Sequence, residues 1–242
     1  MIMESCEKKK CCCGRILMPG IAIAAGLALL GFFVSVGLTR IANQEQYVTV
    51  KGLAEREVLA NKVVWPLPYK CISNDMQNLY DEIEKNKEIV LSFLKNGGIT
   101  DNEIIISAPA VTDRLAQSYI PDNIKFRYQA EAVITVISPQ VEKVIGLMNK
   151  QIELMKEGVI ISNEYNYRTL FEYTALNDIK PAMVEEATRN ARAVAQKFAE
   201  DSDCSLGNIR QATQGQFTIT SDETTPQIKN IRVVTTVKYA LK

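Results

Sequence analysis

The sequence predicts an α+β fold, in which helices pack on a mixed or antiparallel sheet. Runs of alternating apolar and polar residues indicate strands, and three stretches with apolar residues every three or four positions indicate helices. The predicted order is strand–strand–helix–strand–strand–helix–strand–helix–strand–strand, which returns each helix to the sheet. A helix, a glycine and a strand follow one another at 94–106 and again at 155–167, which indicates repeated β-α-β units.

The first three elements are predicted at residues 46–57, 58–73 and 74–96. Pro66 and Pro68 lie in the second strand, and because proline has no N–H to donate, we expect an edge strand or a bulge there. Ser73-Asn74 is the expected N-cap of the helix, and Asn96-Gly97-Gly98 is its expected end. The following side chains are predicted to face the sheet: Leu79, Ile83, Val90 and Leu94.

The middle of the domain contains predicted strands at 103–114 and 125–137. A second helix is expected to start at Ser138, its N-cap, with Pro139 in its first position, and to end at Gly158. Its predicted buried stripe is Val141, Ile145, Met148, Ile152 and Met155.

The last part begins with a long predicted strand at 159–174 and a helix that starts at Asp178, with Pro181 in its first turn. Two strands, 206–218 and 228–241, complete the domain. Glu185 and Arg189 are one turn apart and are expected to form an ion pair on the outer side of the helix. The predicted buried stripe of this helix is Val184, Ala187, Ala191, Val194 and Phe198.

An uncharged, apolar run at residues 16–38 precedes the domain and is long enough for a transmembrane helix. A short basic leader, residues 1–15, carries Lys8, Lys9, Lys10 and Arg15. The positive-inside rule places this leader in the cytoplasm and the domain, residues 41–242, across the membrane, in the periplasm of a bacterial host. Cleavage near Ser35-Val36-Gly37 is the alternative, and would release the domain.

The six cysteines fall into two groups. Four of them, Cys6, Cys11, Cys12 and Cys13, lie in the leader; they are most simply explained as part of a solvated segment, and acylation or zinc binding is a weaker interpretation. Cys71 and Cys204 flank predicted helices, so that either a disulfide or two separate thiols is compatible with the pattern.

The composition excludes several classes of function. From residue 41 onward the chain carries 23 Lys+Arg and 26 Asp+Glu, which is unlike a nucleic-acid-binding surface. The chain contains no His, so Ser-His-Asp and Cys-His catalysis are excluded. Glu55 and Glu57 share one side of a predicted strand, but a solvated strand end explains them better than acid–base chemistry. We therefore expect no enzyme, no metal and no cofactor.

Aromatic residues are the candidates for an interaction surface, although sheet core is the commoner explanation for such a pattern. Tyr165, Tyr167, Phe171 and Tyr173 fall at odd positions of one predicted strand and therefore on one side of it. Such a stripe is either sheet core or a surface for a subunit or ligand. Trp65, between predicted strand residues and two prolines, is similarly either a buried anchor or an exposed docking residue.

Two segments resemble the SIMPL-domain family, which includes a bacterial periplasmic immunogenic protein and an oxidative-stress defence protein. The first is residues 48–58 (VTVKGLAEREV) with Val64-Trp65-Pro66. The second runs from Phe171 through the third helix to residues 233–241 (VVTTVKYAL). The resemblance covers residues 46–241, although Asn61 stands where the family commonly has Asp. It implies an α+β fold, export or anchoring, a homo-oligomer in some members and no catalytic residues.

The main hypothesis is therefore a membrane-anchored, non-enzymatic SIMPL-like ectodomain that self-assembles or binds other envelope proteins. The resemblance links it to envelope or oxidative stress tolerance. The alternative is a small-molecule-binding or enzymatic domain with a pocket between sheet and helices, and a weaker one is redox chemistry through Cys71 and Cys204.

Overall fold

The computed structural model describes residues 24–37, 46–117 and 125–242. The chain divides into two compact units. The terminal unit comprises Met1–Thr49, Ala195–Arg210 and Lys238–Lys242, and the main unit comprises Val50–Val194 and Gln211–Val237. The predicted α+β class is confirmed, with strands paired in antiparallel sheets and helices packed on them.

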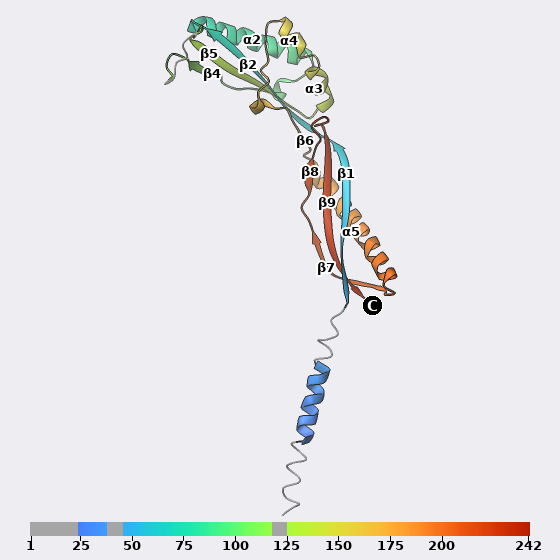
Figure 1. Cartoon of the computed structure of the whole chain (residues 1–242). Helices are drawn as coiled ribbons and strands as arrows, with labels where there is room; N and C mark the ends of the chain where they lie inside the picture. The colour runs from blue at the N-terminus through green and yellow to red at the C-terminus, as the bar shows by residue number, and fades with distance from the viewer. Residues whose placement is uncertain (1–23, 38–45, 118–124) are drawn as a thin grey trace, which may run out of the picture. The chain divides into compact units, whose positions relative to one another are not determined.

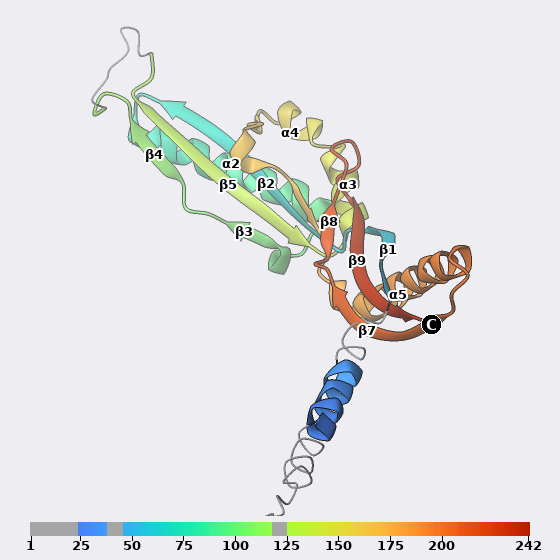
Figure 2. The same ribbon diagram turned by 60° about the horizontal axis from the view of Figure 1, so that its bottom comes forward.

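The main unit contains a five-stranded sheet built around β2 (Lys62–Ser73) and β5 (Tyr128–Ser138) (Figure 1). These two strands pair antiparallel from Val63↔Ser138 to Ser73↔Tyr128. The strand order is β3-β5-β2-β6, with β4 also paired to β5. Alternate residues of β2 are buried, and α2 lies behind β2 and β5 in Figure 2. One side of the sheet therefore forms the core.

Pro66 and Pro68 lie in an inner strand, because β2 has β5 on one side and β6 on the other, so the predicted edge strand is not observed. β6 (Leu170–Glu172) pairs with Lys62–Val64 and does not extend to the two prolines. Ser162 N donates a hydrogen bond to Pro68 O at 2.8 Å. Since the N and O of one residue point to the same side of an antiparallel strand, the missing proline N–H groups face away from β5. The register with β5 is continuous, and there is no bulge.

The strand predicted at 103–114 is broken. Its parts are a 3-10 turn, η1 (Asp101–Glu103), then β3 (Ile104–Ile106) and β4 (Ala110–Asp113). Ile106 and Ala110 are four positions apart in the sequence, but their partners on β5, Ile134 and Glu131, are only three positions apart. The extra residue lies beside Pro109, which cannot donate to β5, so the edge kinks there.

α2 (Met76–Asn96) buries the four residues predicted for it: Leu79, Ile83, Val90 and Leu94. Its N-cap is Asp75, one residue after the predicted cap, and the Asp75 side chain accepts a hydrogen bond from Asn78 N. Ser73 Oγ instead accepts from Asp75 N at 3.1 Å. The helix ends as predicted, with Gly98 at φ +81°.

The second predicted helix is two helices, α3 (Val141–Met148) and α4 (Ile152–Lys156). A turn at 149–151, held by bonds such as Lys150 N to Leu147 O, separates the two helices, and α4 packs against α2 with Leu154 toward the core. The predicted stripe is therefore wrong in its second half, because Ile152 and Met155 are 62% and 60% exposed. Gly158 ends α4 at φ +86°, as predicted. The buried residues are Val141, Val144, Leu147 and Leu154.

The long strand predicted at 159–174 is wrong. This segment contains a single bridge, Tyr69↔Ile161, a 3-10 turn, η2 (Tyr165–Tyr167), and the short β6. Polar residues at 162–164 interrupt the apolar pattern that a buried strand would need. The aromatic residues of this segment therefore do not share one strand face.

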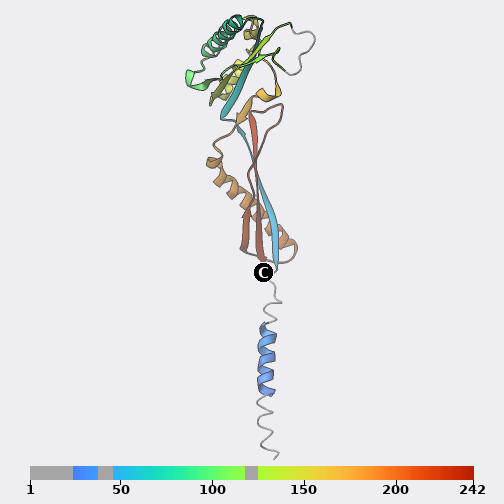
Figure 3. The same ribbon diagram turned by 90° about the vertical axis from the view of Figure 1, so that its left-hand side faces the viewer.

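The second sheet contains β1 (Tyr47–Leu59), β9 (Ile228–Leu241) and β7 (Leu206–Gln214) in the order β1-β9-β7, and β8 (Thr218–Thr220) also pairs with β9 (Figure 3). Gly52 is in tight contact with α5 (Leu176–Asp201): a Cβ there would meet Ala187 O and, at 2.5 Å, Ala191 N. Small residues thus set the helix–sheet distance.

The predicted buried stripe of α5 is partly wrong, because small residues face the sheet where the helix approaches it closely. The helix starts at Leu176, so Pro181 lies inside it, beyond the first turn. Val194 and Phe198 are 41% and 55% exposed. The Glu185–Arg189 ion pair forms as predicted, at 3.1 Å. The buried row, spaced by four residues, is Met183, Ala187, Ala191, Ala195 and Ala199.

Within the terminal unit, backbone hydrogen bonds join residues 241 and 242 to the segment before β1 and to the turn after α5. Leu241 N donates to Gln46 O at 2.7 Å, and Ser205 and Lys242 exchange two bonds at 2.8 Å. Lys238 Nζ lies 3.4 Å from the centre of the Tyr47 ring.

This unit also includes a helix over residues 24–37, with exposed side chains. Among the described residues, no helix combines the length and apolar character needed to span a membrane. Residues 16–23 and 38 of the predicted span, and the leader cysteines, lie outside the described residues.

Candidate functional site: a cavity at the β1–β2 turn

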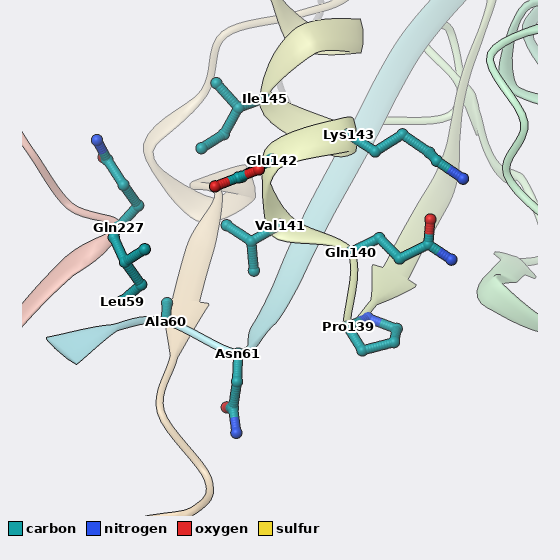
Figure 4. Close-up of a pocket in the computed structure, with 10 residues that line it drawn as sticks. All are labelled: Leu59, Ala60, Asn61, Pro139, Gln140, Val141, Glu142, Lys143, Ile145 and Gln227. Carbon is teal, nitrogen blue, oxygen red and sulfur yellow. The ribbon is translucent and has the colours of Figure 1, made fainter.

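A cavity of about 540 Å³ lies in the main unit, where β1 ends and β2 begins. Its walls come from three segments: the turn Leu59-Ala60-Asn61, the first turns of α3, and Gln227 just before β9. In Figure 4, Val141 points into the space between α3 and the turn, whereas Gln140 and Lys143 extend away from Gln227. The volume is in the usual range for small-molecule sites.

Hydrogen bonds hold the β1–β2 wall in place. Ala60 N donates to Gln227 O at 2.8 Å, and Asn61 N donates to Glu172 O at 3.0 Å. Asn61 Oδ1 accepts from both Thr174 N, at 2.8 Å, and Thr174 Oγ1, at 3.1 Å. The turn between the two strands is therefore fixed by segments distant in sequence.

The wall formed by α3 is fixed at its start by Ser138, which is fully buried. Ser138 Oγ accepts from Gln140 N at 3.0 Å and donates to Glu103. Glu103 also accepts from Thr100 N, and these hydrogen bonds hold the pKa of its carboxyl below the usual range. Lys143 Nζ donates to Gly98 O at 3.3 Å. The Glu103 carboxylate and the Lys143 ammonium are therefore both hydrogen-bonded within the protein.

The chemistry left for a ligand is modest. Leu59, Val141 and Ile145 supply apolar surface, and Glu142 and Gln227 supply one carboxylate and one amide. None of the residues lining this cavity is a nucleophile paired with a base, as covalent catalysis would need. The lining thus combines apolar surface with a few polar groups.

Four of the five aromatic residues considered for an interaction surface are separated by the fold. Trp65 is 3% exposed and packs in the core under α2, so it is a buried anchor. Tyr173 packs against the core under α5. Tyr167 is hydrogen-bonded to Glu131, which raises the pKa of its hydroxyl. Tyr165 is 74% exposed, with the Arg168 guanidinium 3.5 Å from its ring centre.

Cys71 and Cys204 are free thiols in the structure, so the disulfide considered for them is absent here. Cys71 is buried in β2 and accepts a hydrogen bond from Asn86 Nδ2 at 3.3 Å; burial raises the pKa of its thiol. Cys204 is half-exposed in the turn after α5, with Sγ 3.3 Å from Ser202 O. A raised pKa makes Cys71 a poor nucleophile.

Of the two carboxylates on β1, Glu55 has a partner. Its Oε1 lies 3.4 Å from Arg232 Nε of β9. Within residues 24–37, 46–117 and 125–242, no group of three or more His, Cys, Asp or Glu side chains is placed to hold a metal ion.

The sequence pattern does not identify three of the residues that line the cavity: Glu142, Gln227 and Leu59. Glu142 is in the first turn of a helix and Gln227 is in a loop, where polar residues are ordinary. Only the fold brings them together. Asn61, in contrast, stands out in the sequence as a departure from the resembled family.

Comparison with known families supplies the classification. A family model described as SIMPL, a protein of unknown function (DUF541), matches residues 48–238. The chain belongs to the SIMPL family. No curated protein matches it. The resemblance found in the sequence is thus confirmed over most of the chain. The Asn61 departure is chemically small, because the Asn61 carbonyl oxygen accepts the two Thr174 hydrogen bonds that a carboxylate could also accept.

Proposed function

We propose that this SIMPL protein is a membrane-tethered, non-enzymatic module that self-assembles outside the cytoplasm and contributes to envelope or oxidative stress tolerance. The uncharged run at 16–38, preceded by Lys8, Lys9, Lys10 and Arg15, supports the tether and its orientation. The stress link rests on the family resemblance alone.

The observation that carries the assembly part is an exposed apolar pair on α4. Ile152 and Met155 are three residues apart, which places them on one side of the helix, and each is at least 60% exposed. Ile160, shortly after α4, is 71% exposed. Large apolar side chains exposed on one side of a helix favour contact with another protein. We define these three residues as the α4 patch.

Sedimentation velocity on the full-length protein in mild detergent tests the assembly. We expect a wild-type species larger than one chain, and a shift to the monomer in the double variant Ile152→Ser, Met155→Ser. The matched control is Ile209→Ser, which removes an equally large side chain that is 50% exposed in β7. A monomeric wild-type protein would refute the assembly, and an unchanged double variant would refute the α4 patch.

The tether is tested separately by alkaline carbonate extraction of membranes from cells that express the full chain. We expect the protein to stay in the membrane fraction, and a Leu29→Arg variant to be extracted, because a charge in the bilayer centre is costly. Addition of protease to the outside should digest residues 41–242 and leave the leader. Complete extraction of the wild-type protein, or protection of the domain, would contradict the proposal.

The second candidate function is small-molecule binding in the cavity at the β1–β2 turn. Its volume of about 540 Å³ and its mixed apolar and polar lining support this alternative. A Val141→Trp variant would fill the cavity. A thermal-shift screen with wild-type protein and this variant tests it: a ligand that stabilises only the wild type supports binding, and a screen without such a ligand counts against it.

A further inference from the structure

A second hollow, of about 330 Å³, lies on the outer side of the second sheet within the main unit. Arg232, Asn230 and Val234 of β9 form its floor, and Thr218↔Arg232 and Thr220↔Asn230 are cross-strand pairs with β8. Glu55 of β1 and Gln216 before β8 complete it. Six of these seven residues have side chains that can donate or accept hydrogen bonds. This lining is more polar than that of the cavity at the β1–β2 turn, where five of the ten lining residues are apolar.

Most of this hydrogen-bonding capacity is unused within the described residues. The Arg232 guanidinium has five N–H donors, and among the described residues its one ion-pair partner is Glu55, at 3.4 Å. Asn230 Oδ1 is buried without a partner. Because no hydrogen bond holds this amide, it can turn toward a ligand without losing one. An unpartnered buried acceptor is costly, so a donor that reaches it gains more than a donor at an open surface.

The charges of the hollow cancel, since one carboxylate faces one guanidinium. A ligand with net charge would meet an opposing group on one side and repulsion on the other. No aromatic ring lines the hollow, and Val234 is its one apolar residue. Neither a flat aromatic ligand nor an apolar one would find a matching surface. The lining therefore selects a neutral molecule rich in groups that both donate and accept, which are hydroxyls.

We propose that this hollow binds a small, neutral, polyhydroxylated molecule about the size of one sugar ring. Glu55, Thr218 and Asn230 accept from its hydroxyls, and Arg232 donates to its oxygens. The volume is at the low end for small-molecule sites, which fits one ring. This site is independent of the proposed tether and of the α4 patch.

Saturation-transfer difference NMR on the full-length protein, with glucose as the probe, tests the site. We expect a glucose signal with the wild-type protein. In Glu55→Gln this signal should be lost, because removal of a hydrogen bond to a charged group weakens the affinity about tenfold. The matched control is Glu57→Gln, on the same side of the same strand but outside the hollow. This variant should bind glucose like the wild type.

A Thr218→Val variant keeps the test valid if Glu55→Gln fails to fold, since Thr218 is exposed and its replacement favours a strand. It too should weaken glucose binding. Absence of a glucose signal in the wild type, or an unchanged signal in both hollow variants, would overturn the proposal. Displacement of glucose by glycine would overturn the polyhydroxylated class, because glycine has no hydroxyl groups and would pair its ammonium with Glu55 and its carboxylate with Arg232.

Discussion

The main unit packs a helix on a sheet in two regions, and the two do so with different side chains. In the α2 layer, which we define as β2 and β5 with α2, the core contains Trp65, Leu67 and Tyr69 with Leu79 and Leu94 of the helix. In the α5 layer, defined as β1 and β9 with residues 176–194, it contains Ala54, Met183, Ala187, Ile231 and Val233.

This difference determines what each layer tolerates. The α2 layer is filled by large side chains, so it loses stability when one of them is shortened and a cavity remains. The α5 layer is held close by Gly52 and alanines, so it loses stability when a side chain is added. The α2 layer is therefore sensitive to the loss of side-chain volume, and the α5 layer is sensitive to its gain.

The largest effect is expected for Trp65→Ala in the α2 layer. Trp65 is 3% exposed, and its removal leaves a large cavity, so we expect a loss of about 3–5 kcal/mol in the free energy of unfolding. Urea denaturation of the full-length protein measures it. The control is Tyr165→Ala, at a position that is 74% exposed, where a change within about 0.5 kcal/mol is expected. Equal losses in both variants would contradict the buried position of Trp65.

The next effect is expected for Gly52→Ala in the α5 layer. The new Cβ would collide with backbone atoms of α5, which cannot rotate away, so we expect a loss of about 1–3 kcal/mol. Gly146→Ala in α3 is the matched control, because nothing lies within 4 Å of its added Cβ. Alanine favours a helix over glycine, so this variant should gain about 0.5–1 kcal/mol. If both variants change the free energy of unfolding in the same direction, the close approach of Gly52 to α5 is disproved.

A smaller effect is expected where the chain passes from one layer to the other, at Asn61. Asn61→Leu leaves Thr174 N and Oγ1 without their acceptor and should cost about 1–2 kcal/mol. Asn61→Asp keeps an oxygen acceptor, and we expect it to be close to the wild type at neutral pH. If both variants lose the same stability in urea denaturation, the side-chain oxygen is not the group that matters.

The sequence predicts the α2 layer better than the α5 layer, for a physical reason. In α2, an uninterrupted helix buries its most apolar residues, so periodicity alone identifies Leu79, Ile83, Val90 and Leu94. In α5, the same reasoning favours Val194 and Phe198, which are exposed, over Ala195 and Ala199. The choice there depends on how closely the helix approaches the sheet, and this distance is set by Gly52, far away in the sequence.

The sites were less predictable than the fold. The stripe from Val141 to Met155 is broken by a three-residue turn of ordinary polar residues, which no period reveals. The cavity at the β1–β2 turn combines residues from three separate segments, none with a motif. Glu55 and Glu57 are equivalent in the strand pattern, and only the pairing of β1 with β9 gives Glu55 its partner, Arg232.

The smallest expected effect concerns pH and returns to the α2 layer. Ser138 and Thr100 donate hydrogen bonds to Glu103, which lowers the pKa of its carboxyl in the folded protein. This stabilisation is therefore fully present above the unfolded-state pKa of about 4.3 and is lost as the pH falls through the folded-state pKa. Glu103→Gln should flatten the acid side of the stability curve, measured by urea midpoints from about pH 3 to 6.

The control for this prediction is Glu186→Gln in the α5 layer. Glu186 lies 3.9 Å from Arg56, and both side chains are more than 40% exposed, so the ion pair contributes little. Its curve should run parallel to that of the wild type. If Glu103→Gln also runs parallel, the hydrogen bonds between Ser138, Thr100 and Glu103 do not stabilise the ionised carboxyl, and the end of β5 is held to the segment after α2 by packing alone.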